Sequence, residues 1–156
     1  MLTNITERRK KYLGGSMKIG FTCGSFDLLH AGHIIMFEDC KKQCDKLIVG
    51  LQTDPSIDRP LSKNKPIQTL EERRIQLEAV RYIDQIFIYE TENDLQQTLY
   101  ELNPDVRILG SDWKGKPFTG YSLHIPIYFH KRTHDYSTSD LRKRIAEREG
   151  YNGITI

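Results

Sequence analysis

The chain has 156 residues, with 23 lysines and arginines against 21 aspartates and glutamates, which gives a formal net charge of +2. This length predicts one domain, and the balanced charge argues against a dedicated nucleic-acid-binding protein. No apolar run is long enough for a membrane span or a signal peptide, so we expect a cytoplasmic protein with no membrane partner. The 3 cysteines have no C-x-x-C spacing, which argues against a disulfide framework or a zinc site.

The two ends of the chain are polar and are not expected to belong to the domain. Residues 1–16 form a basic leader that we predict to be flexible, because short basic runs are usually solvated. An RNA-binding or membrane-binding arm is the alternative for this leader. Residues 17–150 then form the single domain, and residues 151–156 form a tail.

The first predicted elements are a strand over residues 18–23 and a helix that starts near His33. At a strand-to-helix turn, free backbone N–H groups and the positive end of the helix dipole favour an anion. Gly24 and Gly32 let a phosphate approach the backbone closely, and His30 and His33 are spaced to reach the same ligand. The turn therefore predicts a phosphate site, with a metal-binding histidine pair or an incidental turn as alternatives.

The middle of the chain predicts further α/β elements in order. Residues 46–51 read as a central strand, and residues 55–69 as a polar loop that can close over a ligand. Thr69 is expected to cap a helix that runs to Arg81, because Glu72 completes a capping box and Ile75 falls on its apolar face.

The last elements follow the same alternation. We predict strands at residues 85–89, 106–110 and 125–129, with the last near an edge because Pro126 cannot donate to the ladder. Helices are expected from Asp94 to Leu102 and from about residue 138 to residue 148. Together these elements predict a Rossmann-like open parallel five-stranded sheet with helices on both faces, and a ligand at the carboxyl ends of the strands.

Two segments carry a resemblance to a known superfamily. Residues 24–33, GSFDLLHAGH, look like the first signature of the nucleotidyltransferases, which include the cytidylyltransferases. Residues 132–140, RTHDYSTSD, resemble their second signature, and residues 110–116, GSDWKGK, resemble a block of the glycerol-3-phosphate cytidylyltransferases. The similarity covers Met17 to Glu147. His134 and Asp135 replace the usual Glu-Gly, which leaves the acceptor open, and Ser111 replaces the first aspartate of the block.

The motif and the resemblance together imply a set of site residues. The catalytic candidates are His30, His33, Arg132, Lys63 and Lys65, and further candidates are Arg73 and Lys116. The nucleotide-binding candidates are Cys23, Gly24, Ser25, Phe26, Asp27, Gly32, Arg81, Gly110, Asp112, Trp113, Thr133, Ser137 and Thr138. Asp27 is expected to hold backbone amides or a histidine ring, because a carboxylate repels phosphate.

The resemblance implies transfer of CMP from CTP to a small phosphomonoester such as glycerol-3-phosphate or phosphocholine. Mg²⁺ is expected to arrive with the triphosphate rather than on a side-chain site, and a homodimer is implied by the family. An adenylyltransferase of the same superfamily that uses ATP is the nearest alternative. An RNA-binding or non-catalytic nucleotide-binding module is the alternative from another class.

Overall fold

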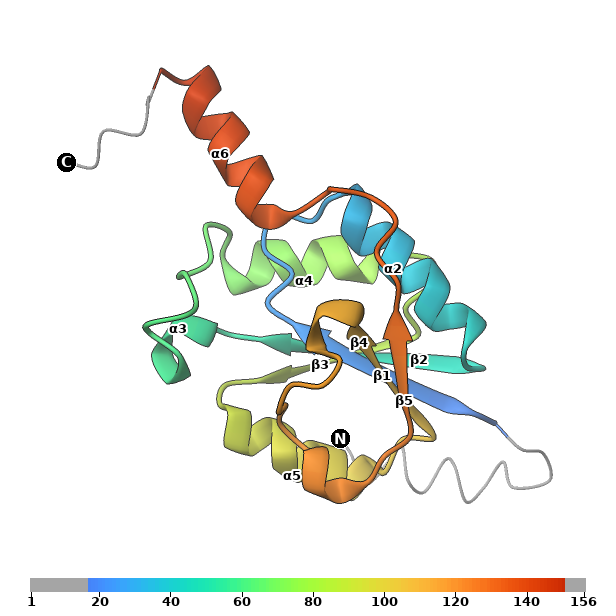
Figure 1. Cartoon of the computed structure of the whole chain (residues 1–156). Coiled ribbons are helices and arrows are strands. Elements are labelled where there is room, and N and C mark those ends of the chain that lie inside the picture. The colour runs from blue at the N-terminus through green and yellow to red at the C-terminus, as the bar shows by residue number, and fades with distance from the viewer. Residues whose placement is uncertain (1–16, 151–156) are drawn as a thin grey trace.

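A parallel five-stranded sheet forms the centre of the computed structural model, which describes residues 17–150 (Figure 1). The strands are β1 (Ile19–Gly24), β2 (Lys46–Gln52), β3 (Gln85–Tyr89), β4 (Val106–Gly110) and β5 (Ile127–His130). Their order is β3-β2-β1-β4-β5, and every pairing is parallel. The predicted fold class is confirmed. The predicted leader and tail lie outside the described residues.

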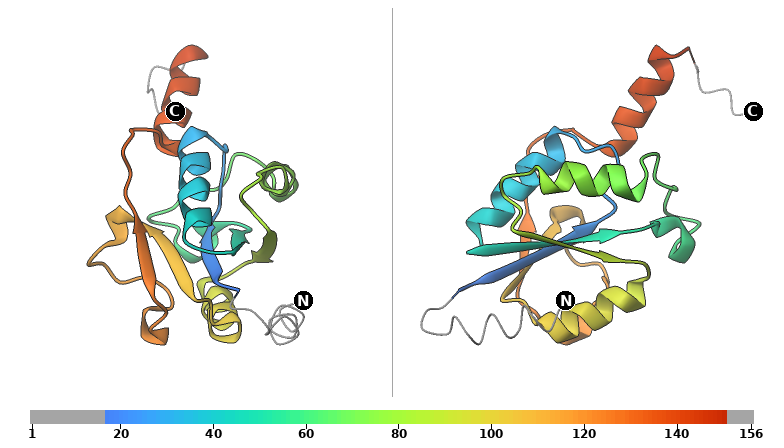
Figure 2. Two further views of the ribbon diagram at one scale, coloured as in Figure 1. Left: turned by 90° about the vertical axis from the view of Figure 1, so that its right-hand side faces the viewer. Right: turned by 180° about the vertical axis from the view of Figure 1, so that it is seen from behind.

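Helices cover both faces of this sheet. They are α2 (Ala31–Lys42), α3 (Pro55–Asp58), α4 (Leu70–Glu78), α5 (Glu92–Leu102) and α6 (Thr138–Arg148), with short 3₁₀ turns η1 (Ser111–Trp113) and η2 (Tyr121–Leu123). In both views of Figure 2, α2 and α4 lie on one face, α5 lies on the other, and α6 projects away from the sheet. Among residues 17–150 no helix is both long and apolar enough to cross a membrane.

The core follows from the alternation of side chains along each strand. On β2, Leu47, Val49 and Leu51 pack with α2 and α4, whereas Ile48 belongs to the cluster beneath α5. Because both faces are covered, these strands are continuous apolar runs, which is typical of parallel sheets. That property made residues 46–51, 85–89 and 106–110 recognisable in the sequence.

Helix α4 shows one prediction confirmed and two that were wrong. Thr69 caps the helix and forms the expected capping box with Glu72. The helix ends at Glu78 and not at Arg81, since Ala79 already serves as its C-cap. Ile75 is 55% exposed and therefore does not belong to the apolar face.

The strand order shows where on the sheet a ligand is expected to bind. The chain leaves β1 toward β2 on one side, and β4 pairs with β1 on the other side. The crevice at the carboxyl ends of β1 and β4 is therefore the topological switch point, where ligands bind in open α/β sheets. The GSFDLLHAGH turn emerges there, directly after β1.

Candidate functional site

The turn between β1 and α2 is held in an unusual backbone conformation. Phe26 and Leu28 both have positive φ angles, +48° and +50°, which cost energy for residues with a side chain. The buried Asp27 carboxylate accepts hydrogen bonds from the backbone N–H groups of Ile67 (2.8 Å) and Gln68 (2.9 Å). Asp27 thus ties the loop before α4 to this turn, as expected of a carboxylate that holds backbone amides.

The two signature histidines are held as neutral hydrogen-bond donors. His30 is the N-cap of α2, and its Nδ1 accepts the backbone N–H of Gly32 at 3.0 Å. The Nδ1 atom of His33 accepts the backbone N–H of His30 at 3.2 Å. Because each Nδ1 is an acceptor, the proton of each neutral ring lies on Nε2. The rings stack with centroids 3.9 Å apart, so both donors belong to one surface.

Burial keeps these rings uncharged at neutral pH. Desolvation lowers the pKa of His33 to about 3, with further lowering by His30 and Arg132. Desolvation also lowers the pKa of His30, and the nearby Arg132 and His134 add to this effect. Both rings can therefore donate to a phosphate oxygen without first taking up a proton.

The start of α6 joins the second signature to the first. The Thr138 hydroxyl lies 3.2 Å from His30 Nε2 and donates to the carbonyl oxygen of Asp27 at 3.4 Å. Ser137 is the N-cap of α6 and accepts from the backbone N–H of Asp140. Arg142 of the same helix lies 3.6 Å from the Asp27 carboxylate. The N-termini of α2 and α6 therefore meet at one place, and both favour an anion there.

A cavity of about 420 Å³ opens at this meeting point, and we call it the histidine cavity. Its lining residues are His30, Gly32, His33, Met36, Lys63, Gly110, Ser111, Asp112, His130, Arg132, His134, Tyr136, Ser137, Thr138 and Ser139. Its volume falls within the range of about 300–1,000 Å³ that is typical of small-molecule sites. The structure therefore brings together the predicted His30, His33, Arg132, Lys63, Asp112 and Thr138, with Gly32, Gly110 and Ser137.

Two further histidines line this cavity, His130 and His134, and neither was predicted as a site residue. The Nδ1 atom of His134 accepts the backbone N–H of Tyr136 at 3.1 Å, so a neutral His134 also carries its proton on Nε2. That Nε2 atom is buried and has no hydrogen-bond partner among the described residues. A buried donor without a partner is costly, which indicates that a ligand atom completes it.

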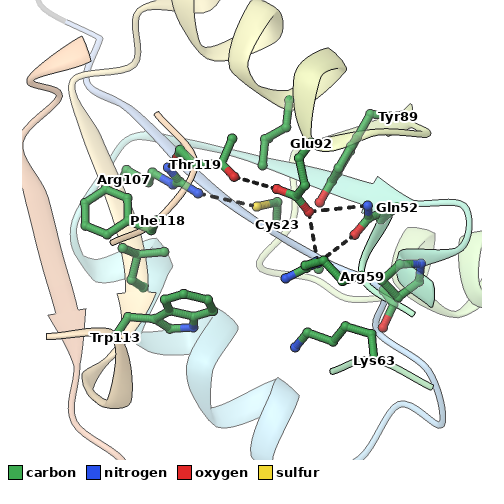
Figure 3. Close-up of a pocket in the computed structure, with 15 residues that line it drawn as sticks. Cys23, Gln52, Arg59, Lys63, Tyr89, Glu92, Arg107, Trp113, Phe118 and Thr119 are labelled. Atoms are coloured by element: carbon green, nitrogen blue, oxygen red, sulfur yellow. Dashed lines mark hydrogen bonds and ion pairs between the residues drawn. The ribbon is translucent and has the colours of Figure 1, made fainter. Parts of the chain in front are cut away.

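A second cavity of about 170 Å³ lies beside the first, and we call it the arginine cavity (Figure 3). Its lining residues are Cys23, Gly24, Ser25, Gln52, Pro55, Arg59, Lys63, Tyr89, Glu92, Leu95, Arg107, Leu109, Trp113, Phe118 and Thr119. Among residues 17–150, Lys63 alone lines both cavities. Cys23, Gly24, Ser25 and Trp113, predicted as nucleotide-binding, lie here and not in the histidine cavity.

Arg73 has a structural position rather than a place in either cavity. It is 2% exposed, and its guanidinium donates to the carbonyl oxygens of Ser25 (2.9 Å), Gln52 (2.7 Å) and Thr53 (2.6 Å). It therefore fastens the ends of β1 and β2 to α4. The resemblance implies that Arg73 contributes to the active site or to a subunit interface, and the structure shows it supporting the loops of the site without lining either cavity.

Several other predicted site residues line neither cavity. Phe26 is buried and packs on the Phe37 and His33 rings. Arg81 is exposed and donates to the Tyr82 hydroxyl. The remaining residues of this group are the exposed Lys65 and Thr133, and Lys116, which lies in a separate surface hollow with Phe129.

The arginine cavity includes polar residues that were not predicted as site residues, among them Gln52, Arg59, Glu92 and Arg107. They come from the end of β2, from the segment after α3, from the start of α5 and from β4. Arg107 carried a readable signal, since a charged residue inside the apolar run 106–110 is unusual for a buried parallel strand. The other three carried none, because their convergence depends on the fold.

The described residues offer no metal centre of their own. No group of three or more His, Cys, Asp or Glu side chains within residues 17–150 is arranged to hold a metal ion. Asp27 is already engaged by backbone amides and Arg142, whereas Asp112 is exposed at the histidine cavity. This arrangement fits a cation that phosphate oxygens hold, with one carboxylate at most.

Comparison with known proteins shows similarity to one family of enzymes and to several of its relatives. The family model described as cytidylyltransferase-like matches residues 21–144. The bifunctional protein HldE of Hyphomonas neptunium is 36% identical over 114 residues, which cover 73% of this chain and 23% of that protein. The HldE protein of Wolinella succinogenes is 33% identical over 146 residues, which cover 91% of this chain and 30% of that protein. The chain therefore spans less than a third of the length of these curated relatives.

Solved structures show the same fold. The lipopolysaccharide core biosynthesis protein from Thermoplasma volcanium matches with a TM-score of 0.60 and 27% identity, and the match covers 78% of this chain and 100% of that one. The pantoate-beta-alanine ligase from Francisella tularensis matches with a TM-score of 0.58 and 16% identity, and covers 94% of this chain and 76% of that one. The latter likeness concerns the fold alone.

Proposed function

The chain belongs to the cytidylyltransferase-like family, and from that premise we propose that it transfers a nucleotidyl group from a nucleoside triphosphate to a small phosphomonoester. The products are a nucleoside diphosphate-linked compound and pyrophosphate. The observation that carries this proposal is the pair of neutral, stacked histidines at the N-terminus of α2, where the His30 Nε2 atom also meets Thr138 at the start of α6. Such donors suit a transition state in which negative charge spreads over phosphate oxygens.

In this proposal the histidine cavity binds the nucleotide. The triphosphate lies against His30, His33 and Thr138, and the base lies toward Asp112 at the carboxyl end of β4. A carboxylate accepts hydrogen bonds only, so it suits the exocyclic amino group of cytosine, adenine or guanine. Uracil has no such group, so the proposal predicts poor use of UTP. The resemblance to cytidylyltransferases, with adenylyltransferases as the nearest alternative, names CTP or ATP as the donor.

The transfer step needs no general base. The second pKa of a phosphomonoester is about 6, so the acceptor is largely a dianion at neutral pH. One of its oxygens attacks the α-phosphorus, the new P–O bond forms, and the bond from the α-phosphorus to the β-bridging oxygen breaks. That electron pair leaves with pyrophosphate. The histidine Nε2–H groups stabilise the charge on the α- and β-phosphate oxygens throughout, so catalysis rests on positioning and electrostatics.

Two cationic side chains are assigned to the charge of the leaving group. Arg132 lines the histidine cavity and offers a planar fork that matches phosphate oxygens. Lys63 lines both cavities and is therefore placed to contact the acceptor phosphate and the triphosphate. Mg²⁺ is proposed to enter with the triphosphate and to neutralise part of its charge. Chelation by EDTA is expected to abolish turnover, and added Mg²⁺ to restore it.

The arginine cavity is assigned to the acceptor. Its volume of about 170 Å³ is smaller than the histidine cavity, and it meets that cavity at Lys63. Glu92, Gln52 and Thr119 bring carboxylate, amide and hydroxyl groups that suit the hydroxyls of a polyol or sugar. A phosphorylated sugar or polyol agrees with the similarity to a lipopolysaccharide core biosynthesis protein.

CTP is the first candidate for the nucleotide donor, and ATP is the second. The GSDWKGK block and the Arg132-Thr133 start resemble cytidylyltransferases, which favours CTP. ATP is the second candidate, because an adenylyltransferase of the same superfamily is the nearest alternative that the two signatures allow. Both nucleotides are therefore included in the test.

The test is pyrophosphate release by the full chain with Mg²⁺, each of CTP, ATP, UTP and GTP, and a panel of phosphorylated sugars and polyols. Release with one donor and one acceptor is expected. His33→Asn keeps an acceptor for the His30 backbone N–H but removes the Nε2–H donor, and it should lower kcat by about 10²–10³. Full activity of that variant, or equal use of UTP, would contradict the assigned roles.

A further inference from the structure

The arginine cavity holds more positive charge than its own residues neutralise. Three cationic side chains line it, Arg59, Lys63 and Arg107, against the single carboxylate of Glu92. Glu92 is already paired with Arg59 at 2.9 Å, and Figure 3 shows this pair on one side of the cavity. Within residues 17–150, neither Lys63 nor Arg107 forms an ion pair. Two positive charges therefore face the acceptor without partners.

Arg107 is the more informative of the two, because it is buried. It stands on β4, an interior strand of the sheet, and is 3% exposed. One Nη donates to the carbonyl oxygen of Thr119, the other approaches Cys23 Sγ at 3.9 Å, and the guanidinium lies 5.3 Å from the centre of the Phe118 ring. Its Nε has no partner among the described residues. A buried guanidinium is costly unless an opposite charge meets it.

Neither neighbouring acidic group supplies that charge. Desolvation raises the pKa of the Cys23 thiol, so Cys23 is neutral beside Arg107 at physiological pH. The Glu92 carboxylate already accepts from the Thr119 hydroxyl (2.7 Å), from Gln52 Nε2 (3.4 Å) and from Arg59. The missing counter-charge is therefore expected from the ligand.

We propose that the acceptor carries a carboxylate in addition to its phosphate, and that Arg107 recognises this carboxylate. The inference rests on the proposed transfer to a phosphomonoester, and it narrows the substrate to a phosphorylated sugar acid or hydroxy acid. Lys63, on the far side of the cavity from Arg107 in Figure 3, meets the phosphate where the two cavities join. Arg107 meets the other end of the molecule.

The charge and the size of the cavity indicate that the acceptor group that meets Arg107 is a carboxylate rather than a second phosphate. A phosphomonoester carries close to two negative charges at neutral pH, whereas Arg107 is the single unpaired cation left once Lys63 serves the first phosphate. A carboxylate carries one charge, is planar and matches a guanidinium edge. The small volume of the cavity, about 170 Å³, also favours the smaller group.

Matched pairs of acceptors test the proposal directly. Glycerol-3-phosphate and 3-phosphoglycerate differ only in a terminal alcohol against a carboxylate, and erythritol-4-phosphate and 4-phosphoerythronate form a longer pair. Pyrophosphate release by the full chain is measured with each compound, Mg²⁺, and CTP or ATP. We expect kcat/KM to favour the acid of at least one pair by about 10- to 100-fold, the size of a charge-assisted hydrogen bond.

Variants then assign the preference to one side chain. Arg107→Met keeps a long apolar stem on β4, and it should lower kcat/KM for the acid by more than for the alcohol, which removes the preference. Arg107→Lys keeps the charge and should retain part of the preference. Arg144→Met, at an exposed position of α6, is the matched control and should behave like the parent protein. The dissociation constant of the nucleotide, measured for every variant, shows that the folded site is intact.

Each outcome separates this inference from the proposed function. Equal use of acid and alcohol by the parent protein, or an equal loss for both in Arg107→Met with nucleotide binding intact, overturns the inference alone. If no compound is turned over, the same pairs are compared as ligands by calorimetry with a non-hydrolysable nucleotide bound, and equal affinities also overturn it. Absence of nucleotide binding by the parent protein overturns the proposed function instead.

Discussion

Burial of His33 makes the stability of the protein depend on pH in a defined direction. The folded protein holds the pKa of His33 at about 3, whereas the unfolded chain has an ordinary histidine pKa of about 6.5. Between these two values the unfolded state binds a proton that the folded state excludes, so stability falls as the pH falls. For this one group, the loss between pH 7.5 and pH 4.5 amounts to about 2.5 kcal/mol.

The measurement compares the parent protein with His33→Asn by urea denaturation at several pH values. Carboxylates and other histidines titrate in both proteins, so the difference in unfolding free energy isolates position 33. We expect the parent protein to lose about 2.5 kcal/mol relative to the variant between pH 7.5 and pH 4.5. A difference that changes by less than about 1 kcal/mol over this interval would refute the argument that His33 is held neutral by burial.

Three further substitutions test the construction of the site. Arg73→Met removes the hydrogen bonds to five carbonyl oxygens, those of Ser25, Gln52, Thr53, Gln68 and Thr69, and should lower the unfolding free energy in urea by about 3–5 kcal/mol; a loss below about 1 kcal/mol would contradict this role. Gly32→Ala puts a Cβ 2.8 Å from His30 Cε1, so kcat should fall about tenfold or more while thermal stability is maintained. Lys63→Met should lower kcat/KM at least about tenfold more than Lys65→Met, since Lys65 lines neither cavity. Equal effects of the two substitutions would show that Lys63 has no role in the transfer.

The fold was predictable because its signals are local. Strands 85–89 and 106–110 were predicted with the bounds that the structure has, since both are short apolar runs flanked by polar residues. The Thr69 cap was equally readable, because a capping box depends on two residues three apart. The end of α4 was not, because no glycine or proline stands near Ala79, which serves as the C-cap.

The histidine cavity was predictable for a related reason. The two signatures are compact motifs, and a sheet of this topology brings the ends of β1 and β4 together with the start of α6. What the motifs did not reveal is how each residue acts. Arg73 matched a family segment, yet it stabilises the loops by donating to five carbonyl oxygens and lines neither cavity.

The arginine cavity lies beyond the reach of motif analysis, because its polar residues come from four separate segments. Parallel pairing of β1 with β4 puts Phe21 opposite Arg107, and this register carries the guanidinium next to Cys23. The charge of Arg107 is unusual within an apolar strand, and its meaning emerges only when Glu92 is seen to be occupied by Arg59. Nucleotidyl transfer requires two ligands to meet at one phosphorus, and two cavities that share Lys63 provide that geometry. In the proposed reaction, the motif residues of the histidine cavity carry the transfer, and the arginine cavity, which no motif marks, selects the acceptor.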